Sequence, residues 1–274
     1  MCDMNDLMEI IKGRKSIRTF DGSTLSDMHR QILEDYIKDI PNPFGIPVEF
    51  VLLDAKEHGL SSPVLSGENL YVAGKVEKTP YADVAFGYSF EKLVLYAWSL
   101  GVGTVWIGGT MKRELFEKAA GLKSGQMMPC ISPLGYSAKK RALRESMMRK
   151  GIGADSRISR DKLFFEEEWG KPIDPDADMA EILEMVRWAP SAVNKQPWRI
   201  VHKDGAYHFY EKKDRGYTSE ETGDLQKIDV GIALCHFIMG LEDKGKKAEI
   251  RIQDAGIKVP ADTEYIVSVM AKED

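Results

Sequence analysis

The chain has 274 residues, 43% hydrophobic and 30% charged, a composition typical of a globular protein with a sizeable core. Its formal net charge of −5 argues against a general nucleic-acid-binding surface. No apolar run approaches the ~20 residues needed to span a bilayer, and the amino terminus lacks the apolar core of a signal peptide. We therefore expect a cytoplasmic protein with neither a nucleic-acid nor a membrane partner.

The cysteine and histidine residues do not form a recognisable metal site. Cys2, Cys130 and Cys235 are odd in number and scattered, which fits neither a disulfide framework nor a zinc pattern. His202 and His208 fall on the two strands of an expected hairpin, and the histidines of the chain form no metal constellation. We expect no bound metal.

The first half of the chain alternates helical and extended patterns. Apolar spacing predicts helices near residues 7–12, 26–38, 83–100 and 111–120, and strands near 48–53, 104–107 and 128–134. The glycine-spotted segment 58–79 is predicted to be a loop, and the basic segment 144–159, which lacks periodicity, a linker.

The second half repeats this organisation. Helices are predicted near residues 179–188 and 225–243, and strands near 199–202, 207–210, 248–252 and 265–270. Asp204-Gly205 predicts a hairpin turn between two of these strands. The same sequence interval separates Gly87 from Gly231 and Gly101 from Gly245, which indicates one architecture written twice.

A loop between two prolines follows the helix predicted at 179–188. The residue before Pro190 is pushed out of the helical region, and Pro197 precedes the next strand. Residues 190–196, here called the Pro190 loop, carry the hydroxyl of Ser191 and the amides of Asn194 and Gln196. Such groups can recognise the carbonyls and ring nitrogens of a flat heterocycle. An ordinary turn rich in capping residues has the same composition, so the spacing leaves both interpretations open.

Two other motifs have possible ligand-binding roles. Arg14-Lys15-Ser16-Ile17-Arg18 combines cations with a hydroxyl, which suits a terminal phosphate but also occurs in charged surface turns. Trp106-Ile107-Gly108-Gly109 ends a predicted strand with two glycines, so bare backbone could approach a flat ligand closely. An ordinary turn at the end of a strand has the same composition. Gly101-x-Gly103 is no dinucleotide fingerprint, because it follows a helix and precedes a strand.

Together, Arg-Lys-Ser-Ile-Arg, Trp-Ile-Gly-Gly and Ala-Pro-Ser-Ala-x-Asn-x-Gln-Pro-Trp, in this order, resemble the nitroreductase family of FMN-dependent NAD(P)H oxidoreductases. The resemblance implies an α+β fold with central, mostly antiparallel sheets packed by helices. It implies FMN as cofactor, NAD(P)H as transient electron donor, and an electron-poor acceptor such as a nitroaromatic or a quinone. FMN carries the difficult chemistry in this family, so no protein side chain is expected to be catalytic.

The resemblance also implies which residues bind FMN. In the family the first basic motif reaches the phosphate and ribityl chain, the glycine strand end lies beside the flavin N5 edge, and basic residues after a Gly-Tyr strand end return to the phosphate. Lys139 is an alternative for the last group if the register slips by one. The implied residues are Arg14, Lys15, Ser16, Ile107, Gly108, Gly109, Lys140, Arg141, Pro190, Ser191, Ala192, Asn194 and Gln196.

The chain is similar to a subgroup in which two diverged halves are fused. Nitroreductases are usually homodimers with FMN at the subunit interface, and here residues 1–150 carry the cations and the glycine strand end, while 151–274 carry the intact Pro190 loop. We therefore expect one intertwined unit, a monomer that acts as an intrachain pseudodimer with one composite FMN site.

Two alternatives remain open from the sequence. One is a related flavoenzyme with dehalogenase or flavin-destroying activity. The other is a non-catalytic flavin-binding or storage protein whose flavin face is blocked, with Tyr71, Tyr81 and Tyr217 as the candidate blocking residues.

Overall fold

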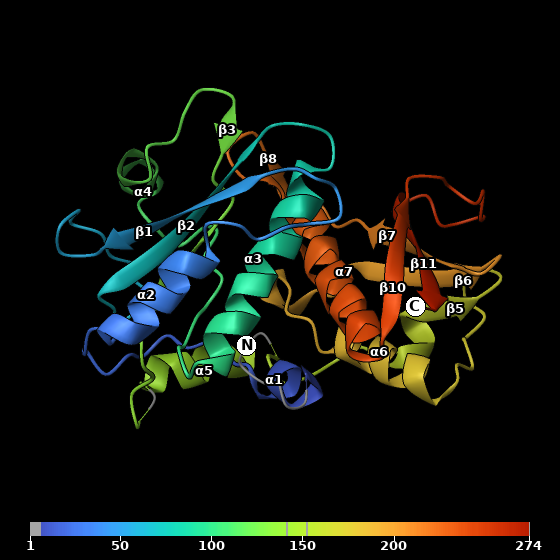
Figure 1. The fold of residues 1–274 in the computed structure, drawn as a ribbon, viewed down its shortest axis with the longest axis horizontal. Coiled ribbons are helices and arrows are strands. Elements are labelled where there is room, and N and C mark those ends of the chain that lie inside the picture. The colour runs from blue at the N-terminus through green and yellow to red at the C-terminus, as the bar shows by residue number, and fades with distance from the viewer. Residues whose placement is uncertain (1–6, 141, 152, 274) are drawn as a thin grey trace. The chain divides into compact units, whose positions relative to one another are not determined.

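A computed structural model describes residues 7–140, 142–151 and 153–273 (Figure 1). The helices are α1 (Leu7–Gly13), α2 (Asp27–Tyr36), α3 (Ala82–Ser99), α4 (Arg113–Ala119), α5 (Leu143–Gly151), α6 (Ala177–Arg187) and α7 (Leu225–Asp243). The strands are β1 (Val48–Asp54), β2 (Leu70–Glu77), β3 (Gln126–Met127), β4 (Ile131–Leu134), β5 (Phe164–Glu166), β6 (Trp198–Lys203), β7 (Ala206–Lys212), β8 (Thr218–Ser219), β9 (Gly223–Asp224), β10 (Lys246–Arg251) and β11 (Thr263–Glu273). Two short 3₁₀ helices are η1 (Arg160–Lys162) and η2 (Ala192–Asn194).

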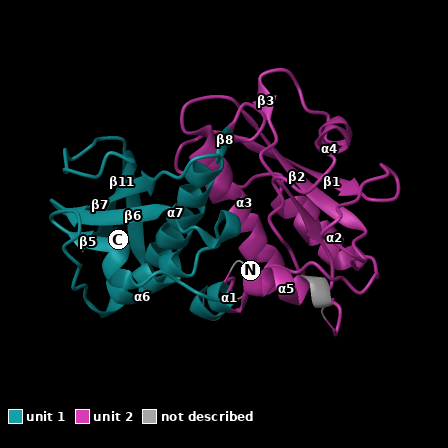
Figure 2. Ribbon diagram, turned by 180° about the vertical axis from the view of Figure 1, so that it is seen from behind, with its two compact units in different colours: residues 1–12, 155–218, 224–274 teal, residues 13–154, 219–223 magenta. Residues whose placement is uncertain are grey.

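The chain divides into two compact units, each with its own sheet (Figure 2). Unit 1 comprises residues 1–12, 155–218 and 224–274, and unit 2 comprises residues 13–154 and 219–223. The amino-terminal residues thus group with the second half of the sequence, and a short segment of the second half groups with the first. The architecture is α+β, as the sequence predicts.

The sheet of unit 2 is built around β2. Strands β1, β3 and β4 all pair with β2 in antiparallel fashion, and β2 is buried except at its last residue. The prediction of a loop over 58–79 is therefore wrong for 70–77. Glycines suggested a loop, but Gly74 lets β2 approach α3, where a Cβ would lie 2.7 Å from Phe86 and 3.0 Å from Phe90. A strand buried on both faces also lacks the alternation that identifies strands.

Residues 104–107 do not form the predicted strand. They make isolated bridges instead: Thr104 pairs in parallel with Ser16, and Ile107 pairs antiparallel with Ile131. These bridges hold the amino-terminal basic motif against the centre of unit 2.

The predicted linker over 144–159 is wrong for its first part, which forms α5. Glu145 and Arg149 are the buried side chains of this helix that the structure describes, 3% and 8% exposed. A helix whose inward face carries charges has no apolar periodicity, so the sequence pattern did not reveal it.

Unit 1 contains a five-stranded sheet in the order β10-β11-β7-β6-β5, antiparallel except for the parallel pair β5–β6. The hairpin predicted at Asp204-Gly205 is confirmed, with φ of 50° and 72° at its two turn residues. Helix α7 packs against α6 and is buried over most of its length (Figure 1). Within the described residues, no helix combines the length and apolarity required to cross a membrane.

The contact between β2 and α3 gives the first testable prediction. Gly74→Ala should lower the free energy of unfolding by about 1 to 3 kcal/mol, because the added methyl group overlaps the buried rings of Phe86 and Phe90. Gly151→Ala is the control, since a Cβ there meets nothing within 4 Å and its φ is not positive. Chemical denaturation of both variants tests this; equal stability would show that the helix–strand contact is looser than described.

Candidate functional site

The two basic motifs of the first half lie together in unit 2. The backbone of residues 17–20 is held on one side by Ile17 N–H, which donates to Thr104 O at 2.9 Å. On the other side Ala138 N–H donates to Thr19 O at 3.0 Å. Segments far apart in the sequence are thereby fixed side by side.

A cavity of about 600 Å³ lies at this junction. It is lined by Lys15, Ile17, Thr19, Trp98, Ser137, Ala138, Lys139 and Glu145. Of the candidates after the Gly-Tyr strand end, Lys139 lines this cavity, whereas Lys140 is exposed and outside its lining. Arg141 lies outside the described residues. Lys139 is exposed as well, so both registers stay predictions.

Arg14 is buried beside this junction, with a side chain 6% exposed. Its Nε lies 3.9 Å from Oε1 of Glu91, and Glu91 Oε2 accepts a hydrogen bond from Trp106 Nε1 at 3.0 Å. No hydrogen-bond partner for Arg14 Nη1 exists among the residues that the structure describes. Burial lowers the pKa of Arg14, and the Glu91 carboxylate opposes this. An anion that accepts from Nη1 would satisfy a donor that is otherwise costly to bury.

Sequence reasoning missed three further groups around Arg14. Arg149 of α5 is buried and close enough to lower the pKa of Arg14 and of Arg18, while Glu145 acts in the opposite direction on Arg18. The Thr104 hydroxyl is also buried, with no partner in the described part of the chain. For Arg18, which the sequence suggested as a structural ion pair, the Glu145 carboxylate raises the pKa against the effect of burial. Three arginines against two glutamates make this region suited to an anion.

The glycine strand end forms a different part of unit 2. Gly108 and Gly109 line a cavity of about 360 Å³, and a Cβ at Gly109 would meet nothing within 4 Å. Arg113 donates to Gly108 O at 2.6 Å and to Met128 O at 2.6 Å, which fixes the turn. Ile107 is buried in the core, and its N–H and C=O both bond to Ile131. The structure thus gives Ile107 a packing role and leaves Gly109 facing open space, next to the half-buried Gly108.

The Pro190 loop has an unusual backbone. Val193, Asn194 and Gln196 all adopt left-handed conformations, with φ of 44°, 58° and 50°. Ser191 Oγ accepts from Gln196 N–H at 2.8 Å, and Asn194 Nδ2 donates to Ser156 O at 3.1 Å. Ser191 and Asn194 remain partly exposed, as does Pro190.

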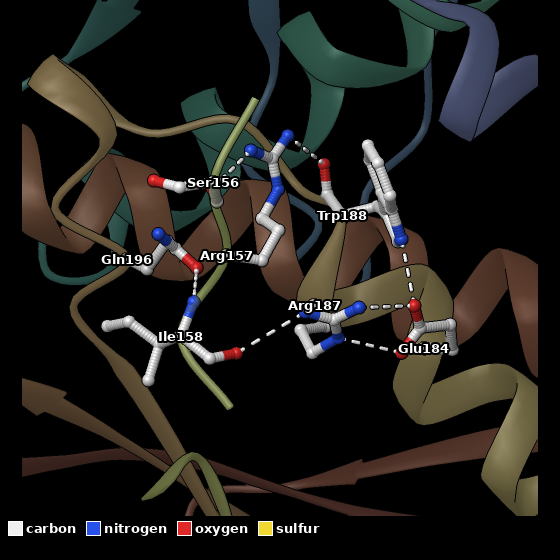
Figure 3. Close-up of polar contacts among 7 residues, drawn as sticks. All are labelled: Ser156, Arg157, Ile158, Glu184, Arg187, Trp188 and Gln196. Carbon is white, nitrogen blue, oxygen red and sulfur yellow. Dashed lines mark hydrogen bonds and ion pairs between the residues drawn. The ribbon is translucent and has the colours of Figure 1, made fainter. Parts of the chain in front are cut away.

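Gln196 is 2% exposed and its amide is used inside unit 1. Its Oε1 accepts from Ile158 N–H at 2.9 Å (Figure 3). Its Nε2 donates to Asn194 O at 3.2 Å. The same neighbouring segment carries Arg157, which donates to Trp188 O and stacks 4.8 Å from the ring centroid of Trp188 (Figure 3). Gln196 therefore shapes the loop, and residues 156–158, which the sequence assigned to a linker, support it.

A buried carboxyl lies near this loop on β7. Glu211 is 1% exposed, and its Oε2 has no hydrogen-bond partner within the described chain. Burial raises the pKa of Glu211 to about 7, and the nearby Asp224 carboxylate adds to the effect. Glu211 is thus partly protonated near neutral pH.

The described residues contain no group of three or more potential metal ligands arranged around a common centre. His202 Nδ1 lies 3.1 Å from the Glu166 carboxylate, and His208 Nδ1 lies 2.7 Å from Ser268 Oγ. Both histidines make ordinary structural contacts.

The chain belongs to the family described as "Putative TM nitroreductase", whose sequence model matches residues 6–241. This membership assigns the protein to the general class of oxidoreductases. A comparison with curated proteins gave no match.

A solved structure shares the fold over nearly the whole chain. The structure described as "a putative nitroreductase" from Thermotoga maritima is 20% identical, with a TM-score of 0.61, and the match covers 96% of this chain and 92% of that one. A nitroreductase with bound FMN from Bacteroides fragilis is 19% identical (TM-score 0.41), covering 51% and 92% of the two chains. An FMN-dependent nitroreductase from Clostridium difficile is 18% identical (TM-score 0.42), covering 49% and 90%.

The buried carboxyl of Glu211 predicts how stability depends on pH. Its ordinary pKa is 4.5 and its folded-state pKa is about 7, so between these values the folded chain holds a proton that the unfolded chain has released. Stability should therefore fall as pH rises from about 4.5 to about 7. Glu211→Gln should flatten this decline and raise the free energy of unfolding at pH 8 by up to about 3 kcal/mol.

Denaturation curves at pH 5 and pH 8 measure this effect. Glu57→Gln, on an exposed turn, is the control and should leave the pH profile unchanged. A Glu211→Gln profile that superimposes on the wild-type profile would contradict the assignment.

Proposed function

We propose that the protein is an FMN-dependent oxidoreductase that transfers electrons from NAD(P)H to an electron-poor acceptor such as a nitroaromatic or a quinone. The observation that carries the proposal is the buried guanidinium of Arg14, whose Nη1 lacks a partner among the described residues, at the junction of the two basic motifs. A terminal phosphate is the ligand group that best matches such donors.

The residues of unit 2 fit the phosphate end of FMN. The buried guanidinium of Arg14 can donate two hydrogen bonds in a fixed direction. The backbone of Ser16 is fixed by its bridge to Thr104. Lys15 and Lys139 add positive charge from the wall of the adjoining cavity. Lys140, which the family resemblance also implicates, stays a prediction, as does Arg141.

The flavin ring is assigned to two backbone features. Gly109 presents bare main chain toward open space beside the half-buried Gly108, and the Pro190 loop leaves Ser191 and Asn194 partly exposed. Each feature occurs once in the sequence, which is our reason for assigning both to one FMN. Bound FMN supplies the redox chemistry, by accepting electrons from the nicotinamide and passing them to the acceptor. The chain's own contribution is to bind and orient.

The alternative, a non-catalytic flavin-storage role, loses one of its three candidate blocking residues. Of the tyrosines that could block a flavin face, Tyr71 lies in the core of unit 2, where it packs against Phe116 at 4.9 Å between ring centroids and donates to Glu68 at 2.8 Å. It is therefore unavailable as a cover.

The purified protein should contain one FMN per chain and be reduced by NAD(P)H. Flavin released by heat, divided by protein concentration, should give a ratio near one, because each motif set is present once. Anaerobic mixing with NADH or NADPH should bleach the flavin absorbance, and menadione should restore it. Two flavins per chain would contradict the single-site assignment, and a flavin that neither nucleotide reduces would favour storage.

Arg14→Ala should weaken FMN binding by about 1.5 to 3 kcal/mol, the scale of a hydrogen bond to a charged group. Fluorescence titration of the apoprotein measures this change. Arg30→Ala is the matched control, because Arg30 is an exposed helical arginine paired with Glu34. Wild-type affinity in Arg14→Ala would show that the phosphate lies elsewhere.

A further inference from the structure

The backbone of the Pro190 loop is strained and needs an external support. Val193, Asn194 and Gln196 all have φ between 44° and 58°, and Val193 is β-branched, which makes this conformation particularly unfavourable. Residues in such conformations persist only where the surrounding structure holds them. Contacts to residues 156–158 support the carboxyl-terminal side of the loop.

The amino-terminal side of the loop is held by a carboxylate from α7. Ala192 N–H donates to both oxygens of Asp229, each at 3.1 Å. Asp229 is 3% exposed and belongs to a helix that is otherwise largely apolar on its buried sides. The bond reaches Ala192 immediately before the first left-handed residue, so it fixes the point at which the chain changes direction.

The surroundings of Asp229 offer no obvious reason for a charge at this position. Neighbouring charges that act on it are those of Asp224, which caps α7, and Glu211 of β7, both acidic. Lys213, Lys227 and Glu264 act in turn on Glu211. Burial raises the pKa of Asp229 well above its usual range, and the Ala192 N–H opposes this rise. A buried acid beside other acids is costly, so its contribution to the fold itself is unfavourable or small.

We propose that Asp229 is a positioning residue that, through the Ala192 amide, holds the Pro190 loop in the conformation that presents Ser191 and Asn194 to the cofactor. The inference rests on the proposed function for its ligand, but the anchoring contact itself does not depend on FMN. Asp229 does not touch the reacting atoms. It acts on them through the loop.

Three variants separate anchoring from general stability. Asp229→Ala removes the acceptor, whereas Asp229→Asn keeps an acceptor oxygen of nearly the same size and position. Glu211→Gln is the matched control, because it neutralises a neighbouring buried carboxyl for which the structure shows no hydrogen bond to the loop in the described residues. Thermal melts establish that each variant is folded.

Two measurements are made on each variant. The first is hydrogen exchange of the Ala192 amide in the full-length apoprotein, which needs no flavin. Asp229→Ala should speed this exchange at least tenfold, while Asp229→Asn stays within about threefold of wild type. The second is FMN affinity, which should fall at least tenfold in Asp229→Ala, be largely rescued in Asp229→Asn, and stay within about twofold in Glu211→Gln.

Each outcome decides a different point. Unchanged exchange at Ala192 in Asp229→Ala overturns the anchor, whatever happens to FMN. Faster exchange with unchanged FMN affinity overturns the positioning role. Equal losses of affinity in Asp229→Ala and Glu211→Gln would make the effect one of general stability and also overturn it. A wild-type chain that binds no FMN refutes the proposed function and the positioning role with it, while the exchange result still decides whether Asp229 anchors the loop.

Discussion

The buried guanidinium of Arg14 carries a desolvation cost that the candidate site has to compensate. A guanidinium cannot release its proton in a protein, so unlike a buried lysine it cannot escape the cost of desolvation by becoming neutral. Glu91 lies 3.9 Å away, which is long for a strong ion pair, and Arg149 adds a further positive charge. The backbone bridge between Ser16 and Thr104 fixes the segment that carries Arg14 within unit 2. Among simple ligand groups, a dianionic phosphate compensates this arrangement best.

Unit 1 shows the opposite sign of buried charge. Asp229 and Glu211 are buried carboxyls, and burial raises the pKa of each toward the neutral form; Asp224 adds to the rise at both, and Glu211 adds to it at Asp229. These groups can lose their charge by binding a proton, so the cost is smaller than for buried arginines. The two units therefore carry two different groups of buried charge: arginines in unit 2 that stay ionised, and carboxyls in unit 1 that can become neutral by binding protons. Both lie next to motifs that the sequence singled out.

The sequence predicted those parts of the fold that long apolar runs, an apolar helical face or turn residues mark. Helices α3 and α7, the hairpin between β6 and β7, and the end of α6 before Pro190 were all predicted within a few residues. It failed at β2, where burial on both faces removes alternation and Gly74 mimics a loop. It failed again at α5, whose described buried side chains are charged. Arg149 and Thr104 could not have been assigned to the candidate site, because their proximity to Arg14 arises from tertiary packing alone.

The Pro190 loop shows why a sequence motif can identify a binding site even though some of its residues do not contact the ligand. Gln196, one of the most distinctive residues of the motif, is buried, and its side-chain amide forms hydrogen bonds with Ile158 and Asn194. Ser191 Oγ accepts a hydrogen bond from the backbone N–H of Gln196, so two residues of the motif contact each other. These side chains encode the left-handed backbone between them, which no run of ordinary residues adopts readily. The motif thus specifies a loop conformation first, and the loop in turn leaves Ser191 and Asn194 partly exposed. Recognition of a ligand then depends on groups outside the motif, such as the carboxylate of Asp229, that keep the conformation in place.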